Sequence, residues 1–401
     1  MPDQRLQRLK NQAHAILLQN RRTTGAAQYT IPSPTSYPYQ WLWDSCFHAI
    51  ILTHFSLADA KKELRSLLSK QFANGLIPHM IYWEKNDVLN IDWGKADTSS
   101  ITQPPMIAYA AWRIFEKDQD RTFLSAIYPH LYHYYNYLLT ERDPRRHHLA
   151  GIINPDESGE DDSPRFDETL GLAAQHAPEE NLQRRLALIA KNKTCNFDAP
   201  FCMKNFFWVK DVPFNAILVE NLSKLALIAN RLGRPEEALF FREQEVRVTR
   251  AMRDQMMKDG LFWSTFGQDY QQIPVKTWAL FAPLFAGIST PDEARILVEE
   301  YLRHDKYFAA PFSVPTVSLD EPSFNPNGFW RGPVWLAPNW FIHQGLIRYG
   351  YREDAERIRE HTAKLLDQSG FREYFNPHSG AGLGAQNFTW GGLIVDMYAG
   401  I

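Results

Sequence analysis

Seven carboxylates lie within the thirteen residues 156–168, whose sequence is DESGEDDSPRFDE. A run of charge usually faces water, so a solvated acidic loop is the simplest interpretation. Two other interpretations involve chemistry, because carboxylate oxygens bind calcium and paired carboxyl groups act as general acid and base. The rest of the chain is needed to choose among the three.

The metal interpretation has weak support from residue spacing. Four residues follow part of a calcium-loop pattern: Asp156, Ser158, Glu160 and Asp167. The glycine that such a loop requires lies two places early, at Gly159. His147 and His148 are adjacent rather than spaced as zinc ligands, and there is no phosphate-binding glycine loop or Gly-x-Ser-x-Gly motif. We therefore expect no metal and no cofactor, with a bound calcium as the alternative.

Aromatic residues are unusually frequent, at 13% of 401 residues with twelve tryptophans. Core packing explains most aromatic side chains, but tryptophan exposed near carboxylates is how proteins stack on sugar rings. Four segments combine Trp, Gly or Pro with polar residues: 37–44 (YPYQWLWD), the acidic stretch, 328–335 (GFWRGPVW) and 371–392 (FREYFNPHSGAGLGAQNFTWGG). Together they favour a carbohydrate pocket.

Charge and hydropathy narrow the class of protein. A net charge of −3 gives no reason to expect nucleic acid or anionic lipid as a partner. No apolar run approaches the ~18 residues of a membrane helix, and residues 1–20 are typical of an amphipathic helix rather than a signal peptide. Cys46, Cys195 and Cys202 are an odd set without metal spacing, which fits a reducing cytoplasm. We expect a cytoplasmic protein with no nucleic-acid or membrane partner, and the sequence leaves a homo-oligomer open.

Helical periodicity recurs in pairs, an apolar helix followed by a charged amphipathic one. The expected pairs are 44–55 with 57–71, 103–115 with 120–140, 213–232 with a helix from Pro235, 274–288 with 290–303, 333–349 with 352–366, and 390–401 with the N-terminal helix. There is no regular alternation of strands and helices, which argues against a parallel sheet. Six helical hairpins that bury each other's faces predict an all-α closed ring.

The links between these helices are unequal in length. Links from an apolar to a charged helix are short, whereas links from a charged to an apolar helix are long and contain the four segments. In a ring of hairpins the long links emerge at one end, which predicts a pocket on one face. We expect one catalytic domain, 1–401. The longest link, 143–211, is an inserted segment with its own helix at 178–191 and a candidate lid.

The ordered motifs QWLWD, ESGEDDSPR, GFWRGPVW and EYFNPHSG resemble those of glycoside hydrolase family 63, which includes processing α-glucosidase I. The closer likeness is to small bacterial members that act on mannosylglycerate and glucosylglycerate, and it covers essentially the whole chain. It implies an (α/α)6 barrel and an inverting α-glycosidase for a small α-glucoside or α-mannoside such as those two compounds. Members often carry tyrosine before WRGP, where this chain has Phe329, and this departure puts a glycerate-type aglycone in question.

The resemblance places Asp161 at the general-acid position and Glu373 at the general-base position. In an inverting enzyme the acid protonates the leaving oxygen and the base activates water, with the carboxyl groups roughly 6.5–9.5 Å apart. Burial and the neighbouring carboxylates are expected to keep Asp161 protonated by raising its pKa. Most of the other carboxylates in the stretch are expected to face water.

The resemblance places Tyr37, Trp41, Trp43, Asp44 and Gln103 at sugar-contact positions and matches Trp330, Arg331 and Trp335 to the WRGPxW loop. With Trp390, these nine residues are the expected substrate contacts. Asp44 is suited to bind two sugar hydroxyls, although capping of the following helix is the alternative, as it is for Gln103. Arg331 is expected to orient a catalytic carboxylate or bind an anionic aglycone, with a structural ion pair as the alternative. For Trp390 the alternatives are closing the pocket and core packing.

Other functions remain open from the sequence alone. One variant of the same chemistry cleaves another small α-glucoside, such as a glucosylglycerol or a disaccharide. A catalytically inactive sugar-binding barrel is a different class, but it would need neither Asp161 nor Glu373. An epimerase or lyase would favour paired histidines or tyrosines over two carboxylates.

Overall fold

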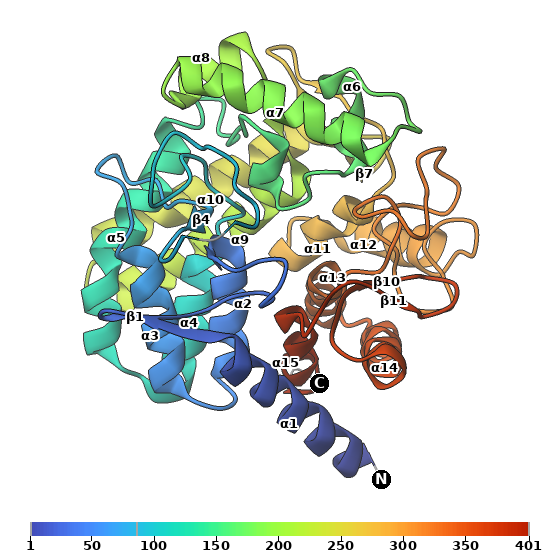
Figure 1. Cartoon of the computed structure of the whole chain (residues 1–401). Helices are drawn as coiled ribbons and strands as arrows, with labels where there is room; N and C mark the ends of the chain where they lie inside the picture. Colours follow the sequence, from blue (N-terminus) through green and yellow to red (C-terminus); the bar gives the residue numbers. More distant parts are fainter. Residues whose placement is uncertain (1, 86, 400–401) are drawn as a thin grey trace.

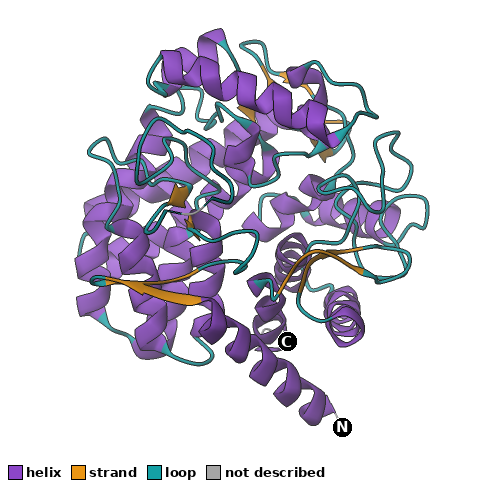
Figure 2. Ribbon diagram, viewed as in Figure 1, coloured by secondary structure: helices purple, strands orange, loops and turns teal. Residues whose placement is uncertain are grey.

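A computed structural model describes residues 2–85 and 87–399, and most of the chain is helical (Figures 1 and 2). The helices of the main body are α1 (Pro2–Asn20), α2 (Leu42–Leu52), α3 (Leu57–Leu68), α4 (Ile107–Asp118), α5 (Arg121–Thr140), α9 (Val212–Arg231), α10 (Pro235–Met256), α11 (Ala282–Ala286), α12 (Pro291–Ile296), α13 (Leu336–Arg348), α14 (Arg352–Ser369) and α15 (Leu393–Ala399). A 3-10 turn precedes α11 (Trp278–Phe281) and α15 (Thr389–Gly392), and a π-helical turn, Leu297–Leu302, extends α12.

Six of these helices form a closed inner ring. Helix α2 contacts α4, and the contacts continue through α9, α11, α13 and α15 back to α2. Every residue of α2 is buried, which explains why this inner helix is mostly apolar. The outer helices are amphipathic: α3, α5, α10 and α14 pack on α2, α4, α9 and α13, and α1 packs on α15. The prediction of an all-α (α/α)6 barrel is confirmed.

Two details differ from the expected helices. Helix α4 begins at Ile107 rather than at residue 103, because Pro104 and Pro105 disfavour helical backbone before them. Helix α9 is the one helix among the described residues long and apolar enough to cross a membrane. It is an inner helix with most of its residues buried, so the barrel core accounts for its composition.

Asp396 on α15 makes hydrogen bonds that connect the last inner helix to earlier inner elements of the ring. Its carboxylate accepts hydrogen bonds from Arg113 of α4 at 2.5 Å, from Trp340 of α13 at 2.9 Å and from His54 just after α2 at 3.0 Å. Burial opposes this charge, but these partners lower the pKa of Asp396 to about 2. A charged group from the last helix thus connects three earlier inner elements.

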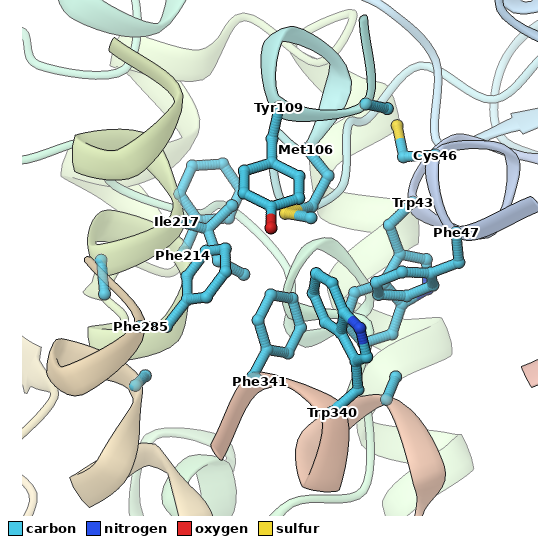
Figure 3. Packing of buried hydrophobic residues seen from close by; sticks show 14 of the residues in the cluster. Trp43, Cys46, Phe47, Met106, Tyr109, Phe214, Ile217, Phe285, Trp340 and Phe341 are labelled. Atoms are coloured by element: carbon cyan, nitrogen blue, oxygen red, sulfur yellow. The ribbon is translucent and has the colours of Figure 1, made fainter. Parts of the chain in front are cut away.

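Aromatic side chains fill the middle of the barrel. Figure 3 shows Tyr109, Phe285, Trp340 and Phe341 packed together from three inner helices. Phe47 of α2 lies 6.1 Å from Trp340 between ring centroids and continues this layer. The barrel is therefore filled at this level, and the long links build any pocket above it.

Short antiparallel strands, which the sequence analysis did not predict, hold the long links in place. They form β1–β2 (Arg21–Thr24, Ala27–Thr30), β3–β4 (Gln40–Trp41, Met80–Ile81), β5–β8–β9 (Val209–Lys210, Thr265–Phe266, Gln271–Gln272), β6–β7 (Met257–Lys258, Leu261–Phe262) and β10–β11 (Arg372–Phe375, Gly382–Gln386). The longest link carries α6 (Asp167–Leu170), α7 (Pro178–Thr194) and α8 (Ala199–Asn205), drawn in green in Figure 1. Helix α7 corresponds to the helix expected at 178–191.

Candidate active site

A cavity of about 210 Å³ lies where the long links meet. Its wall contains all the sequence-predicted site residues except Arg331: Tyr37, Trp41, Trp43, Asp44, Gln103, Asp161, Trp330, Trp335, Glu373 and Trp390. These residues come from five separate links and the first turn of α2, so the barrel brings together groups that are up to about 350 positions apart in the chain. Aromatic rings with a few carboxyl groups among them are what a sugar ring requires.

Glu373 lies on β10 with both carboxylate oxygens hydrogen-bonded. Oε1 accepts from the hydroxyl of Tyr37 at 2.6 Å, and Oε2 accepts from the backbone N–H of Ala385 on β11 at 2.7 Å. Burial raises the pKa of Glu373 above its usual value, although these two hydrogen bonds act in the opposite direction. The result is a carboxylate with fixed orientation and increased proton affinity.

Asp44 lies in the first turn of α2 and does not cap that helix. The N-cap residue is Trp41, which makes no side-chain capping bond, so the capping alternative for Asp44 is wrong. Oδ1 of Asp44 accepts a hydrogen bond from the indole N–H of Trp390 at 2.7 Å. Burial raises the pKa of Asp44 to about 6. A carboxylate in this position can accept hydrogen bonds from sugar hydroxyls at neutral pH.

Tryptophans surround Asp44 and continue along the wall. Trp43 and Trp390 meet edge to face at 5.1 Å, and Trp390 also contacts Phe47 of the core at 5.6 Å. Trp330 stacks on Trp335 with 3.8 Å between ring centroids. Trp390 therefore both lines the pocket and packs in the core, so its two interpretations are compatible.

The acidic stretch is largely buried, contrary to the expectation that most of its carboxylates face water. Of the seven, Glu168 is the one exposed residue. Arginines neutralise three of the others: Arg142 binds Glu157, Arg165 binds Glu160 and Arg331 binds Asp167. Two of the four calcium-loop positions, Glu160 and Asp167, thus have arginine partners. No group of three or more His, Cys, Asp or Glu placed to hold a metal occurs in 2–85 or 87–399.

Asp161 has a different environment from the expected one. Arg185 on α7 donates from Nη1 to Oδ2 of Asp161 and from Nη2 to Oδ1 of Asp156, the latter at 3.2 Å. A guanidinium beside a carboxyl group favours its ionised form. The neighbouring carboxylates, which were expected to keep Asp161 protonated, are largely paired with arginines, and the group facing Asp161 is a cation.

Arg331 does not line the cavity. Its Nη1 and Nη2 donate to the two oxygens of Asp167 at 2.9 and 2.7 Å, and Nη2 also donates to the carbonyl oxygen of Ala174 at 2.6 Å. The side chain is buried, and the structure has the structural ion pair that was its alternative. This ion pair connects the link that contains Trp330 to the 143–211 segment.

Several wall residues were missed from the sequence: Pro32, His79, Met80, Leu89, Ile91, Trp93, Asp156, Gly159, Arg185, Phe329 and Phe388. Burial, together with the charge of Arg185, lowers the pKa of His79 to about 3, so this imidazole is neutral. His79 lies in the long link between α3 and α4, and Arg185 lies on the helix expected over the pocket mouth. The available sequence signal for these two residues was their location in long links, which were expected to build the pocket.

The model of one protein family, the mannosylglycerate hydrolase MGH1-like glycoside hydrolase domain, matches residues 37–391. The mannosylglycerate hydrolase of Thermus thermophilus is 32% identical over an alignment covering 95% of this chain and 98% of that protein. The glucosylglycerate hydrolase of Mycolicibacterium hassiacum is 28% identical, with 91% and 93% covered.

Solved structures agree with these matches. The crystal structure of the GH63 mannosylglycerate hydrolase from Thermus thermophilus in complex with Tris and D-glycerate superposes with a TM-score of 0.89 at 32% identity. The alignment covers 98% of this chain and 100% of that one. The complex of the same enzyme with glucose gives a TM-score of 0.86 at 33% identity.

Proposed function

The chain belongs to the mannosylglycerate hydrolase MGH1-like family of glycoside hydrolases, and we propose that it hydrolyses a small α-glucoside or α-mannoside whose aglycone is a glycerate-like anion, with inversion. The observation that carries this proposal is the joint presence of Asp161, Glu373 and the cation Arg185 in the wall of one aromatic cavity. Two carboxyl groups supply the chemistry, and the cation supplies the preference for an anionic aglycone.

Each carboxyl group has a distinct role in this mechanism. Glu373, fixed by Tyr37 and Ala385, takes a proton from a water molecule that attacks the anomeric carbon. Asp161 gives its proton to the glycosidic oxygen as the bond from that oxygen to the anomeric carbon breaks. Water attacks opposite the leaving group, so an α-glycoside releases a β-sugar.

The sugar ring is proposed to bind at the aromatic end of the cavity. Asp44 accepts hydrogen bonds from sugar hydroxyls there, while Trp43 and Trp390 pack against the ring. Tyr37, Trp41, Gln103, Trp330 and Trp335 complete that part of the wall. Relatives named for mannosylglycerate and for glucosylglycerate are both similar to this chain, so the proposal includes both sugars.

The aglycone is proposed to bind on the side of Arg185. Its guanidinium is buried, and the Nε–H has no hydrogen-bond partner. An unpartnered N–H on a buried guanidinium suits the carboxylate of a glycerate group, and the D-glycerate complex of the Thermus relative supports such a ligand. Because Arg185 belongs to α7, we also propose that the 143–211 segment acts as the lid of a single catalytic domain.

An NMR assay tests the proposed function. Purified protein is incubated with α-glucosylglycerate, α-mannosylglycerate, α-glucosylglycerol and α-linked disaccharides, and the first anomer released is recorded. We expect β-sugar from at least one glycerate glycoside and much slower release from the neutral compounds. Release of α-sugar would contradict inversion, and turnover of the neutral compounds alone would contradict the anionic aglycone.

Two variants test the assigned roles. Asp161→Asn and Glu373→Gln keep the shape of each side chain and are expected to lower kcat by about 10²–10⁴-fold. Asp305→Asn is the matched control, because Asp305 is almost fully exposed. Wild-type kcat in either catalytic variant would overturn the assignment. No turnover of any compound by the wild-type protein, with sugar binding intact, would favour an inactive sugar-binding barrel.

A further inference from the structure

We propose that Arg185 controls the protonation of Asp161. In the free protein it holds Asp161 as a carboxylate, and an aglycone carboxylate that binds the same guanidinium makes Asp161 take up the proton it needs as an acid. This inference rests on the proposed function and adds a regulatory property to it: the anionic part of the substrate activates the acid that cleaves it.

The geometry shows one guanidinium shared by two carboxyl groups. Arg185 uses Nη1 for Asp161 and Nη2 for Asp156, and its side chain is 9% exposed. The Nε–H of Arg185 and Oδ2 of Asp156 are buried without hydrogen-bond partners. Buried polar atoms are nearly always paired, so these two atoms indicate a site that is incomplete until a ligand binds.

Among the described residues, Arg185 is the one Lys or Arg side chain in the cavity wall. Nearby carboxylates on the same stretch have other partners: Glu157 has Arg142, Glu160 has Arg165, and Asp162 faces Arg331 and His176. The cavity wall also contains Asp44, Tyr37 and Glu373, and none of these side chains carries a positive charge. His79 is neutral and supplies no counter-charge. The charge state of Asp161 therefore depends chiefly on Arg185.

A bound ligand carboxylate would be the third carboxylate around Arg185, beside Asp156 and Asp161, and would change the net charge of this group. Two ionised aspartates and one guanidinium carry a net charge of −1, and an added ligand carboxylate would bring it to −2 in a water-poor site. Like charges raise the proton affinity of carboxyl groups, so uptake of one proton from solvent is favoured on binding. Asp161 is proposed as the acceptor because its side chain, 23% exposed, is the freer of the two to leave Nη1 toward the cavity. Burial raises the pKa of Asp156, which makes Asp156 the competing acceptor.

The cycle balances in protons and bonds. Protonated Asp161 gives its proton to the glycosidic oxygen, the bond to the anomeric carbon breaks, and water oxygen bonds to that carbon while its proton passes to Glu373. Asp161 is then a carboxylate again and competes with the product carboxylate for Arg185, which favours product release. Glu373 returns its proton to solvent.

Proton uptake is the direct test. Calorimetric titration with D-glycerate in buffers of different ionisation enthalpy at neutral pH measures the protons bound per ligand. We expect net uptake approaching one proton in the wild-type protein, partial uptake in Asp156→Asn, which removes one of the two aspartate charges, and none in Asp161→Asn. Uptake that persists in Asp161→Asn overturns the proposal, as does binding of D-glycerate by the wild-type protein without uptake.

Kinetics provide an independent test that does not depend on the folding of an Asp161 variant. The pH profile of kcat/KM reports the free enzyme and that of kcat the substrate complex. For a glycerate glycoside, the alkaline limb of kcat should lie at least about one pH unit above that of kcat/KM, whereas the limbs coincide for a neutral glycoside. Coinciding limbs for both substrates overturn the proposal.

Substitution of Arg185 should change kcat/KM in opposite directions for a glycerate glycoside and for a neutral glycoside. Arg185→Met removes the cation, so kcat/KM should fall at least about 100-fold for a glycerate glycoside but rise for a neutral α-glycoside near pH 7. Arg185→Lys should restore part of the preference. A fall for both substrates contradicts the proposal. If no glycoside is hydrolysed by the wild-type protein, the proposed function fails, while proton uptake still decides this inference.

Discussion

The hydroxyl of Tyr37 lies 2.6 Å from Oε1 of Glu373, although 336 positions separate the two residues. Burial and the negative charge of Glu373 raise the pKa of Tyr37 well above its usual value, so Tyr37 stays protonated and donates this hydrogen bond. The bond favours the ionised form of Glu373 and opposes the effect of burial on its pKa. Tyr37, in the link between α1 and α2, thus affects the pKa of the Glu373 carboxylate on β10.

Tyr37→Phe should shift the pH dependence of activity. Loss of a hydrogen bond to a charged group costs about 1.5–3 kcal/mol, which corresponds to a rise of at least about one unit in the pKa of Glu373. A general base works ionised, so activity is lost as pH falls through its pKa, and the acid limb of kcat/KM should move to higher pH. Tyr349→Phe, whose hydroxyl binds the carbonyl of Ser289, is the control. An unchanged acid limb would contradict this role.

Gly159 and Gly171 form a matched pair for testing Trp43. Both have positive φ, at +74° and +68°, so alanine costs about 1–2 kcal/mol of backbone strain at each. A methyl group at position 159 would also overlap the indole of Trp43, whereas nothing lies within 4 Å at position 171. We expect Gly159→Ala to lower kcat/KM by roughly 100-fold by displacing Trp43, and Gly171→Ala to affect stability alone. Equal kinetics in the two variants would exclude a role for Trp43 in substrate binding.

The ion pair of Arg331 with Asp167 should matter for stability rather than for substrate affinity. Arg331→Met leaves a buried aspartate without its partner and should destabilise the protein by about 3–5 kcal/mol in urea unfolding. The double variant Arg331→Met, Asp167→Leu should recover most of that loss, because an apolar pair can replace a buried ion pair. A large rise in KM for Arg331→Met with unchanged stability would instead return Arg331 to the substrate site.

The helical ring was predictable because the inner helices are mostly apolar and the outer helices are amphipathic. Both patterns repeat in the sequence, as with α9 followed by α10. The small sheets were not predictable, since strands of two residues such as Gln40–Trp41 form only because a distant segment lies beside them. Hydrogen-bond pairing of this kind has no periodic signal.

The residues of the candidate site could be predicted where they belong to a recognisable sequence motif. Their charges could not be predicted, because these depend on which side chain each residue pairs with. The motifs point to Asp161 and Glu373, and both line the same cavity. The sequence contains Arg142, Arg165 and Arg185 but does not show which carboxylate each one binds. Because these pairings form only when the 143–211 segment folds, the sequence predicted the carboxyl groups but not their charges.

Asp396 provides a pH-dependent test of ring closure. Its pKa is about 2 in the folded protein, below the value of about 3.9 in an unfolded chain, so it contributes about 2–3 kcal/mol at pH 7. That contribution is present above the unfolded pKa, falls to about half by pH 3 and is nearly lost as pH passes through 2. Asp396→Asn should therefore lower the free energy of unfolding by at least this amount at pH 7 and by less at pH 3. Asp305→Asn, at an exposed site, is the control. If Asp396→Asn lowered the free energy of unfolding by the same amount at pH 7 and pH 3, packing rather than the charge of Asp396 would be what stabilises the closed ring.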